Sequence, residues 1–295
     1  METRPYNYQE KTMYNCGLVL EGGGSRGIYT SGVLDAFIEN GIEFPYVIGV
    51  SAGSCNAASF LGKCKRRQHD ITIGYINDKR YMGMSHYLNN GEYLNYDWIF
   101  GELSYDLMPL NHEEFEKSNS VLCCVAVNAK TGKAEYFYPK TLRPRGCPEL
   151  RASCALPLFT KGVEIGGETY FDGGLVDSIP LERALDDGCE KAVVILTQFK
   201  GYQKQPVNPR IEKLLGKKYP RITQAVKNRH IIYNAQLEYV KQMEAEGRAL
   251  VIQPLADLHC PTLEKNTAKL ESIYLLGRSQ GEQFIDKVKK FMAQP

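Results

Sequence analysis

Residues 47–56 read Val-Ile-Gly-Val-Ser-Ala-Gly-Ser-Cys-Asn and place a serine between two glycines directly after an apolar run. The apolar run predicts a buried strand, and the small and apolar residues 52–61 predict a buried helix, so Ser51 falls at the turn between them. The spacing Gly49-x-Ser51-x-Gly53 is typical of a nucleophile in a cramped strand-to-helix turn, because glycines remove side chains that would collide there. Ser51 is therefore a candidate nucleophile, and a structural glycine-serine turn is the alternative.

The same order of strand, glycine turn and helix occurs earlier in the chain. The apolar run 16–20 precedes Glu-Gly-Gly-Gly-Ser-Arg-Gly at 21–27, and helical periodicity follows through residues 28–38. This glycine spacing also fits the GxGxxG of dinucleotide-binding turns, which need an acid at the end of the next strand to hold a ribose. Ser51 occupies that place instead, which argues against a nucleotide site.

The glycine turn suits a different task. Gly22, Gly23 and Gly24 carry no side chains, and such a loop exposes successive backbone N–H groups that can bind the oxygen of a tetrahedral acyl intermediate. We expect Gly23 and Gly24 to be these donors. We expect Arg26 to brace the loop through hydrogen bonds, and contact with an anionic head group is the alternative role.

A third motif follows a strand-like segment at Tyr-Phe-Asp-Gly-Gly, residues 170–174. Asp172 ends the segment, and the two glycines after it allow its carboxylate to emerge at a tight turn beside another part of the backbone. An aspartate that only caps a turn is the alternative. The co-occurrence with the other two glycine motifs makes Asp172 a candidate base for Ser51.

A Ser-His-Asp hydrolase would also need a histidine within reach of the serine. Only His230 and His259 follow Asp172 in the order serine, acid, histidine. His259 follows a predicted strand, so a Ser51-Asp172-His259 triad is the rival to a mechanism without histidine.

The order of the predicted elements indicates an α/β fold. Strands alternate with helices, which favours a mainly parallel central sheet flanked by helices. Two hairpins are expected, at 121–138 and at 162–171 with a turn at Gly166-Gly167. Further strands are expected at 192–197 and 249–253, and long helices at 222–246 and 266–292.

Residues 70–117 differ from the rest, since many tyrosines and other aromatic residues lie there in polar, glycine-containing sequence. Such an excursion can cover an apolar substrate site. A set of short helices that pack these rings on the sheet is the alternative.

Composition limits the function classes. The net charge of +2 gives no reason to expect nucleic-acid binding, and the nine cysteines indicate neither a disulfide framework nor a zinc site. No signal peptide or spanning segment is evident, so a cytoplasmic location is expected. The basic segment 200–230 has one acid among its many cations; it predicts either peripheral contact with an anionic membrane or a solvated helical face.

The motifs GGGSRG, GVSAG and DGG, in this order, resemble those of the patatin-like phospholipases, and Arg-Ala-Ser-Cys-Ala-Leu-Pro at 151–157 is similar to a small-residue helix of that family. The resemblance covers about residues 15–200, taken as the catalytic domain, and leaves 201–295 as a mainly helical region that packs on it or extends it. It implies a three-layer α/β/α fold and a lipid or acyl-ester substrate. It implies no metal and no cofactor.

The resemblance also implies roles for individual residues. Ser51 corresponds to the nucleophile and Asp172 to the base of a dyad without histidine. The oxyanion loop corresponds to Gly22, Gly23 and Gly24, and the supporting motif positions are Arg26, Gly27, Gly49, Gly53, Gly173 and Gly174. The resulting hypothesis is a serine-dependent phospholipase or carboxylesterase that works through an acyl-enzyme. The competing hypotheses are the triad with His259 and a non-enzymatic lipid- or nucleotide-binding module.

Overall fold

One sheet of eight strands organises the computed structural model, which describes residues 13–143, 145–215 and 218–294. The sheet order is β5-β6-β3-β2-β1-β7-β8, and β4 pairs with β3. Five strands run parallel: β1 (Tyr14–Leu20), β2 (Tyr46–Val50), β3 (Val121–Asn128), β7 (Cys189–Ile195) and β8 (Ala249–Ile252). At one side of the sheet the pairings are antiparallel: β4 (Ala134–Phe137) and β6 (Glu168–Asp172) each pair with β3, and β5 (Val163–Ile165) pairs with β6.

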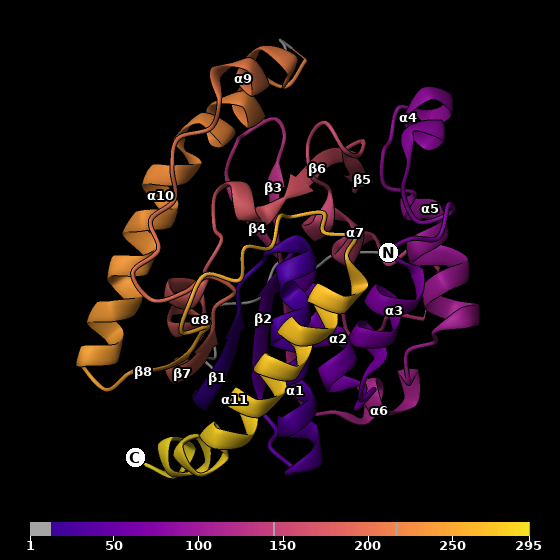
Figure 1. Cartoon of the computed structure of the whole chain (residues 1–295). Coiled ribbons are helices and arrows are strands. Elements are labelled where there is room, and N and C mark those ends of the chain that lie inside the picture. Colours follow the sequence, from indigo (N-terminus) through magenta and orange to yellow (C-terminus); the bar gives the residue numbers. More distant parts are fainter. Residues whose placement is uncertain (1–12, 144, 216–217, 295) are drawn as a thin grey trace.

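Helices cover both faces of the sheet, and Figure 1 shows α11 crossing in front of α1 while α10 runs along the opposite flank. One layer contains α1 (Gly27–Glu39), α2 (Ala52–Leu61) and α11 (Thr267–Ala293), and the other contains α8 (Leu181–Asp186) and α10 (Pro220–Ala245). The prediction of an α/β fold with a mainly parallel sheet between helical layers is confirmed.

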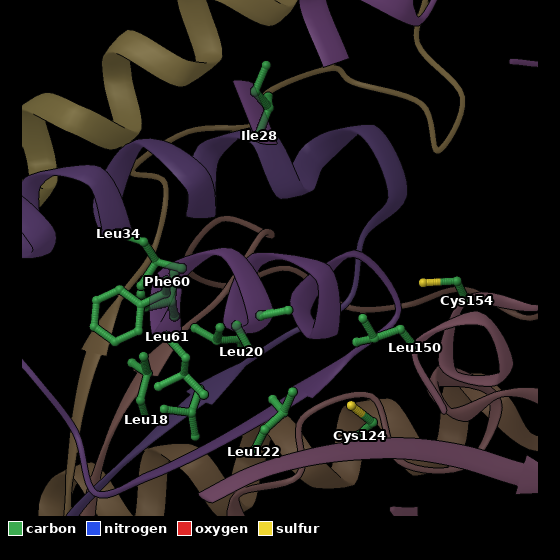
Figure 2. Packing of buried hydrophobic residues seen from close by; sticks show 14 of the residues in the cluster. Leu18, Leu20, Ile28, Leu34, Phe60, Leu61, Leu122, Cys124, Leu150 and Cys154 are labelled. Carbon is green, nitrogen blue, oxygen red and sulfur yellow. The ribbon is translucent and has the colours of Figure 1, made fainter. Parts of the chain in front are cut away.

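Side chains alternate across the parallel strands and so build two cores. In β1, Leu18 and Leu20 join the cluster under α1 and α2, whereas Val19 joins the cluster under α8 and α10. Figure 2 shows Leu18 and Leu20 facing Phe60 and Leu61 of α2. These strands read as continuous apolar runs because both of their faces are buried.

Both predicted hairpins are present, as the pairs β3-β4 and β5-β6. The turn of the second hairpin has positive φ at Gly166 (60°) and Gly167 (84°), which glycine tolerates without strain. The largest difference in strand bounds concerns β7, which begins at Cys189 rather than at residue 192. Its polar start is still strand, because Cys189 pairs with the beginning of β1.

The excursion at 70–117 consists of short helices. They are α3 (Arg67–Tyr75), α4 (Met84–Asn90), α5 (Tyr96–Trp98), the π-helical η2 (Ile99–Leu107) and α6 (His112–Lys117). Several of the rings pack on one another, since the ring centroids of Tyr75 and Tyr81 lie 5.9 and 6.4 Å from that of Trp98. The remaining short elements are η1 (Gly24–Arg26), α7 (Pro148–Cys154), η3 (Gly173–Leu175) and α9 (Pro209–Leu215). Within the described ranges, no helix is long and apolar enough to cross a bilayer.

The C-terminal helix α11 lies directly on the backbone of α1. A Cβ atom on Gly277 would stand 2.1 Å from the carbonyl oxygen of Tyr29, and one on Gly32 would stand 2.2 Å from that of Tyr274. The hydroxyl of Tyr29 donates to Oε1 of Gln280 at 2.7 Å. Glycine at the crossing therefore allows the two helices to approach to backbone contact.

This packing makes Gly277 sensitive to a single methyl group. We predict that Gly277→Ala lowers the free energy of unfolding by about 1 to 3 kcal/mol, because the added Cβ must push the two backbones apart. The midpoint of urea unfolding measures the loss.

Gly74→Ala is the matched control, since Gly74 is an exposed helical glycine with nothing within 4 Å of its virtual Cβ. There the better helix propensity of alanine should raise stability by about 0.5 to 1 kcal/mol. Equal effects of the two substitutions would contradict the close packing of α1 and α11.

Candidate active site

Strand β3 brings Ser51 and Asp172 to the same place, because it pairs with both strands that carry them. Val50, the last residue of β2, pairs with Val125. Asp172, the last residue of β6, pairs with the adjacent residue Ala126. Ser51 and Asp172 lie far apart in the sequence, but the strands that carry them end beside adjacent residues of β3.

Ser51 sits in a strained backbone conformation, with φ of 56° and ψ of −127°. The two glycines of its motif are needed for space. A Cβ on Gly49 would lie 2.6 Å from backbone atoms of Gly53, and one on Gly53 would lie 2.5 Å from the carbonyl oxygen of Leu20. The end of β2, the start of α2 and the end of β1 thus touch through their backbones, which holds the serine at a sharp turn.

Hydrogen bonds to the serine side chains of Ser54 and Ser153 stabilise this turn. Ser51 donates its backbone N–H to Oγ of Ser153 at 2.9 Å, and Ser54 donates to the carbonyl oxygen of Gly49 at 2.7 Å. The hydroxyls of Ser54 and Ser153 lie 2.8 Å apart. Ser153 belongs to the segment 151–157 singled out by resemblance, but sequence reasoning gave it no role of its own.

Asp172 is buried at 2% exposure and faces the serine turn. Its Oδ1 accepts the backbone N–H of Gly174 at 2.7 Å, so it also caps the turn after β6. Burial raises the pKa of the Asp172 carboxyl, while the positive charge of Arg229, a hydrogen bond from the Ser51 side chain and the Gly174 N–H oppose that rise. The carboxylate therefore performs the capping expected of the alternative interpretation and also contacts Ser51.

Arg229 is a functional candidate that sequence reasoning included only as one cation of the basic segment. It comes from α10, and its Nε donates to the carbonyl oxygen of Gly174 at 2.6 Å. Its guanidinium lies next to the turn that carries Asp172, since a virtual Cβ on Gly174 stands 3.3 Å from Nη2 of Arg229 and 3.0 Å from Oδ1 of Asp172. No local motif marks the residue, because its helix reaches the site only through the fold.

The glycine turn packs against the serine turn. A Cβ on Gly22 would stand 3.1 Å from Cβ of Ser51, and one on Gly27 would stand 2.8 Å from Cβ of Ala52. In the described part of the chain, no acceptor is found for the backbone N–H groups of Gly23 and Gly24. These two donors lie in the turn that packs on the serine turn, and Gly24 lines the same cavity as Ser51.

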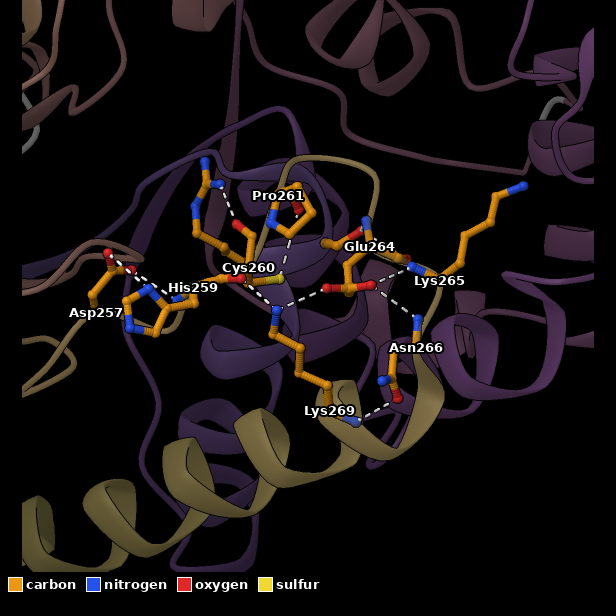
Figure 3. A network of polar contacts seen from close by, with 10 residues as sticks. Asp257, His259, Cys260, Pro261, Glu264, Lys265, Asn266 and Lys269 are labelled. Atoms are coloured by element: carbon orange, nitrogen blue, oxygen red, sulfur yellow. Dashed lines mark hydrogen bonds and ion pairs between the residues drawn. The ribbon is translucent and has the colours of Figure 1, made fainter.

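A segment of the C-terminal region, residues 257–266, lies across this glycine turn and hydrogen-bonds to it; we call this segment the strap. The carbonyl oxygen of Thr262 accepts the N–H of Ser25 at 2.9 Å, and that of Cys260 accepts Nη1 of Arg26 at 2.8 Å. The bracing role expected for Arg26 is present in these contacts. Figure 3 shows the polar network of the strap, in which Lys269 contacts Glu264.

An apolar cavity of about 140 Å³ opens at Ser51. Its wall combines Gly24, Cys55 and Leu263 with many residues of the aromatic excursion, among them Ile71, Met82, Leu94, Ile99 and Phe100. The excursion therefore packs its own rings and also lines the space beside the serine. A cavity of this character accepts an apolar chain.

The histidines lie elsewhere. The side chain of His259 is 82% exposed, and its Nδ1 is 3.4 Å from Oδ2 of Asp257. His230 contacts the carbonyl oxygen of Lys227 through its Nδ1. Among the described residues, no histidine contacts Ser51 or Asp172, and no group of His, Cys, Asp and Glu side chains is placed to hold a metal ion.

Two family models match the chain. That of the patatin-like phospholipases matches residues 18–185, and that of a domain of unknown function, DUF6363, matches residues 219–293. The predicted boundary after residue 200 falls between the two matches and stays a prediction. A solved structure, that of VipD from Legionella pneumophila, is similar with a TM-score of 0.47 and 12% identity over 92% of this chain and 67% of that chain.

Curated relatives match much of the chain. The uncharacterized protein YjjU of Escherichia coli is 28% identical over 94% of this chain and 79% of its own length. The probable lipid hydrolase 463L of Invertebrate iridescent virus 6 is 26% identical over 61% of this chain and 67% of its own length. Lysophospholipase nte1 of Aspergillus niger is 22% identical over 93% of this chain, which spans 18% of that protein. Since the first family model spans more than half of the residues, the chain belongs to the patatin-like phospholipase family of ester-bond hydrolases.

Proposed function

We propose that this protein is a lipid acyl hydrolase in which Ser51 and Asp172 form a catalytic dyad. The observation that carries the proposal is that β3 brings the strained turn at Ser51 and the buried carboxylate of Asp172 together beside an apolar cavity. The family match and the lipid hydrolases among the relatives support a lipid ester as the substrate.

In the acylation step, Oγ of Ser51 attacks the ester carbonyl while its proton passes to the carboxylate of Asp172. The carbonyl oxygen gains negative charge and is stabilised by the free N–H groups of Gly23 and Gly24. Asp172 then returns the proton to the leaving alcohol, and the acyl group remains on Ser51. Hydrolysis follows when Asp172 takes a proton from water while the water oxygen attacks the acyl carbonyl. The bond to Oγ of Ser51 then breaks, the fatty acid leaves, and Asp172 returns the proton to Ser51.

An aspartate in water is a weak base for a serine hydroxyl, with a reference pKa of about 3.9. Here burial raises the pKa of Asp172, which strengthens it as a base. The fixed approach of the two side chains and the oxyanion donors supply the rest of the rate enhancement. One donor of this kind contributes about 3 kcal/mol.

The dyad makes a direct prediction for a short-chain p-nitrophenyl ester. Ser51→Ala and Asp172→Asn should each lower kcat/KM by about a thousandfold or more, because each removes a member of a unit that acts together. Initial rates of p-nitrophenol release measure the loss, and thermal unfolding shows whether each variant is folded.

His259→Ala is the matched control, because it removes the base of the rival triad from an exposed position. It should leave kcat/KM within about twofold of the parent protein, since surface substitutions of this kind are mild. A loss of about a thousandfold in folded His259→Ala would establish the triad instead, and full activity in both dyad variants would refute the dyad.

The pH dependence depends on Arg229. Because the Arg229 charge lowers the pKa of Asp172, its removal raises that pKa, and a higher pH is then needed to ionise the base. We predict that Arg229→Gln moves the acid limb of the kcat/KM profile to higher pH. At pH values above this limb, the kcat/KM of the variant should come closer to that of the parent protein. A neutral p-nitrophenyl ester keeps the substrate from titrating in the same range.

Arg229→Lys serves as the control, because it keeps the positive charge and should move the limb less than Arg229→Gln. Other titratable groups also face Asp172, namely the side chains of Cys55, Cys154 and Tyr96, and both variants leave them unchanged. An acid limb at the same pH in the parent and in Arg229→Gln would contradict the electrostatic link.

The cytoplasmic location and the membrane contact through 200–230 stay predictions. Exposed cations on this segment support the contact, and they include Arg210, Lys218, Arg221 and Lys227. The side chain of Lys213 and all of Lys217 lie outside the described residues.

A further inference from the structure

Two cations of the basic segment turn inward rather than toward solvent. Lys204 follows β7 and Arg229 lies on α10, and both are half-buried. The Nζ of Lys204 lies 4.3 Å from the centre of the Tyr233 ring, and the Tyr233 hydroxyl donates to Oε1 of Glu21 at 2.7 Å. Because Glu21 directly precedes the glycine turn, Lys204 is held close to the oxyanion donors.

The position of Lys204 is fixed by its backbone. Its N–H donates to Oδ1 of Asn234 at 2.8 Å, and Nδ2 of Asn234 donates back to its carbonyl oxygen at 3.1 Å. The side chain of Arg229 is fixed by the bond from its Nε to the carbonyl oxygen of Gly174. Arg229 belongs to α10 and Lys204 is bound to α10 through Asn234, and this helix lies in the region matched by the domain of unknown function.

The cations in this place have no ion-pair partner within the described residues. The carboxylate of Glu21 accepts the N–H of Thr197 at 2.6 Å as well as the Tyr233 hydroxyl. Burial lowers the pKa of Lys204 to about 8, and repulsion by Arg229 and Arg26 adds to the effect, while Glu21 opposes it. None of the ion pairs in the described part of the chain includes Lys204, Arg229 or Arg26. The carboxylates near these cations are those of Glu21, Asp172 and Asp257, and none of the three forms an ion pair with one of these cations.

Lys204 and Arg229 belong to a different layer of the fold from the apolar cavity. Tyr233, against which Lys204 packs, belongs to the core under α10, whereas Ile71, Leu94 and Phe100 of the cavity wall belong to the other face of the sheet or to its excursion. A substrate with its ester at Ser51 can therefore place an apolar chain in the cavity and an anionic group near the cations.

We propose that Lys204 and Arg229 form the subsite for the phosphate group of an anionic lysophospholipid and so select it over neutral acyl esters. Arg26, held by the strap, adds its charge to the site. The proposal rests on the proposed hydrolase function, and it assigns a substrate-binding role to the region at 219–293. Ammonium and guanidinium groups are the usual protein partners of phosphate oxygens.

The test compares two substrates with the same acyl chain, 1-acylglycerol 3-phosphate and 1-acylglycerol. The parent protein should show a higher kcat/KM for the phosphate ester. Lys204→Met keeps an apolar stem against Tyr233 but removes the charge, and it should reduce the preference for the phosphate ester about tenfold, mainly through KM. Lys200→Met, at an exposed position four residues earlier, is the matched control and should keep the preference.

A variant that keeps the charge and two phosphate inhibitors distinguish a head-group subsite from a folding defect and from a site for free phosphate. Lys204→Arg should retain the preference even if Lys204→Met folds poorly, because it keeps the charge. Glycerol 3-phosphate and inorganic phosphate should inhibit the parent competitively and inhibit Lys204→Met less. Inhibition by phosphate without any substrate preference would overturn the head-group assignment and indicate a site for free phosphate.

An unchanged preference in folded Lys204→Met would overturn the subsite while leaving the dyad intact. Failure of the parent protein to hydrolyse any acyl ester would count against the hydrolase function itself. In that case calorimetric binding of glycerol 3-phosphate to parent and Lys204→Met still tests the subsite, and equal affinities would overturn it.

Discussion

The register of β3 is the constraint on which the rest of the site depends. Its residues Val125 and Ala126 pair with Val50 and Asp172 in turn, so the ends of two strands from distant parts of the sequence meet at one point. Pairing shifted by one residue would turn the carboxylate to the other face of the sheet. The positions of the strained turn at Ser51, the cap at Asp172 and the apolar cavity all depend on this register.

The C-terminal region completes this arrangement rather than standing apart from it. Helix α11 lies on α1 through glycine contacts, the strap at 257–266 holds the glycine turn, and α10 supplies Arg229. Strand β8 extends the same sheet beside β7. A chain that ended at residue 200 would lose the contacts that hold the glycine turn and the cation beside Asp172.

The sequence predicts those parts of the site that are encoded locally. Ser51 and the glycines around it form a turn whose steric needs can be read from a few neighbouring residues, and Asp172 stands at the end of a recognisable hairpin. Ser153, Arg229 and Lys204 could not be assigned from sequence, because each acts through packing between segments far apart in the chain. The strong alternation of apolar strands and helices predicts the layers well. It misses the polar start of β7, whose pairing depends on β1.

The central claim is that Ser51 is a nucleophile activated by Asp172, and covalent labelling with a fluorophosphonate tests it most directly. Such a reagent modifies activated serines and leaves ordinary surface serines unmodified. Intact-mass measurement with peptide mapping should show one adduct, on Ser51, with none in Ser51→Ala and much slower labelling in Asp172→Asn. Folded protein that fails to label, or that labels equally in Ser51→Ala, would contradict the account and favour a non-enzymatic lipid-binding role.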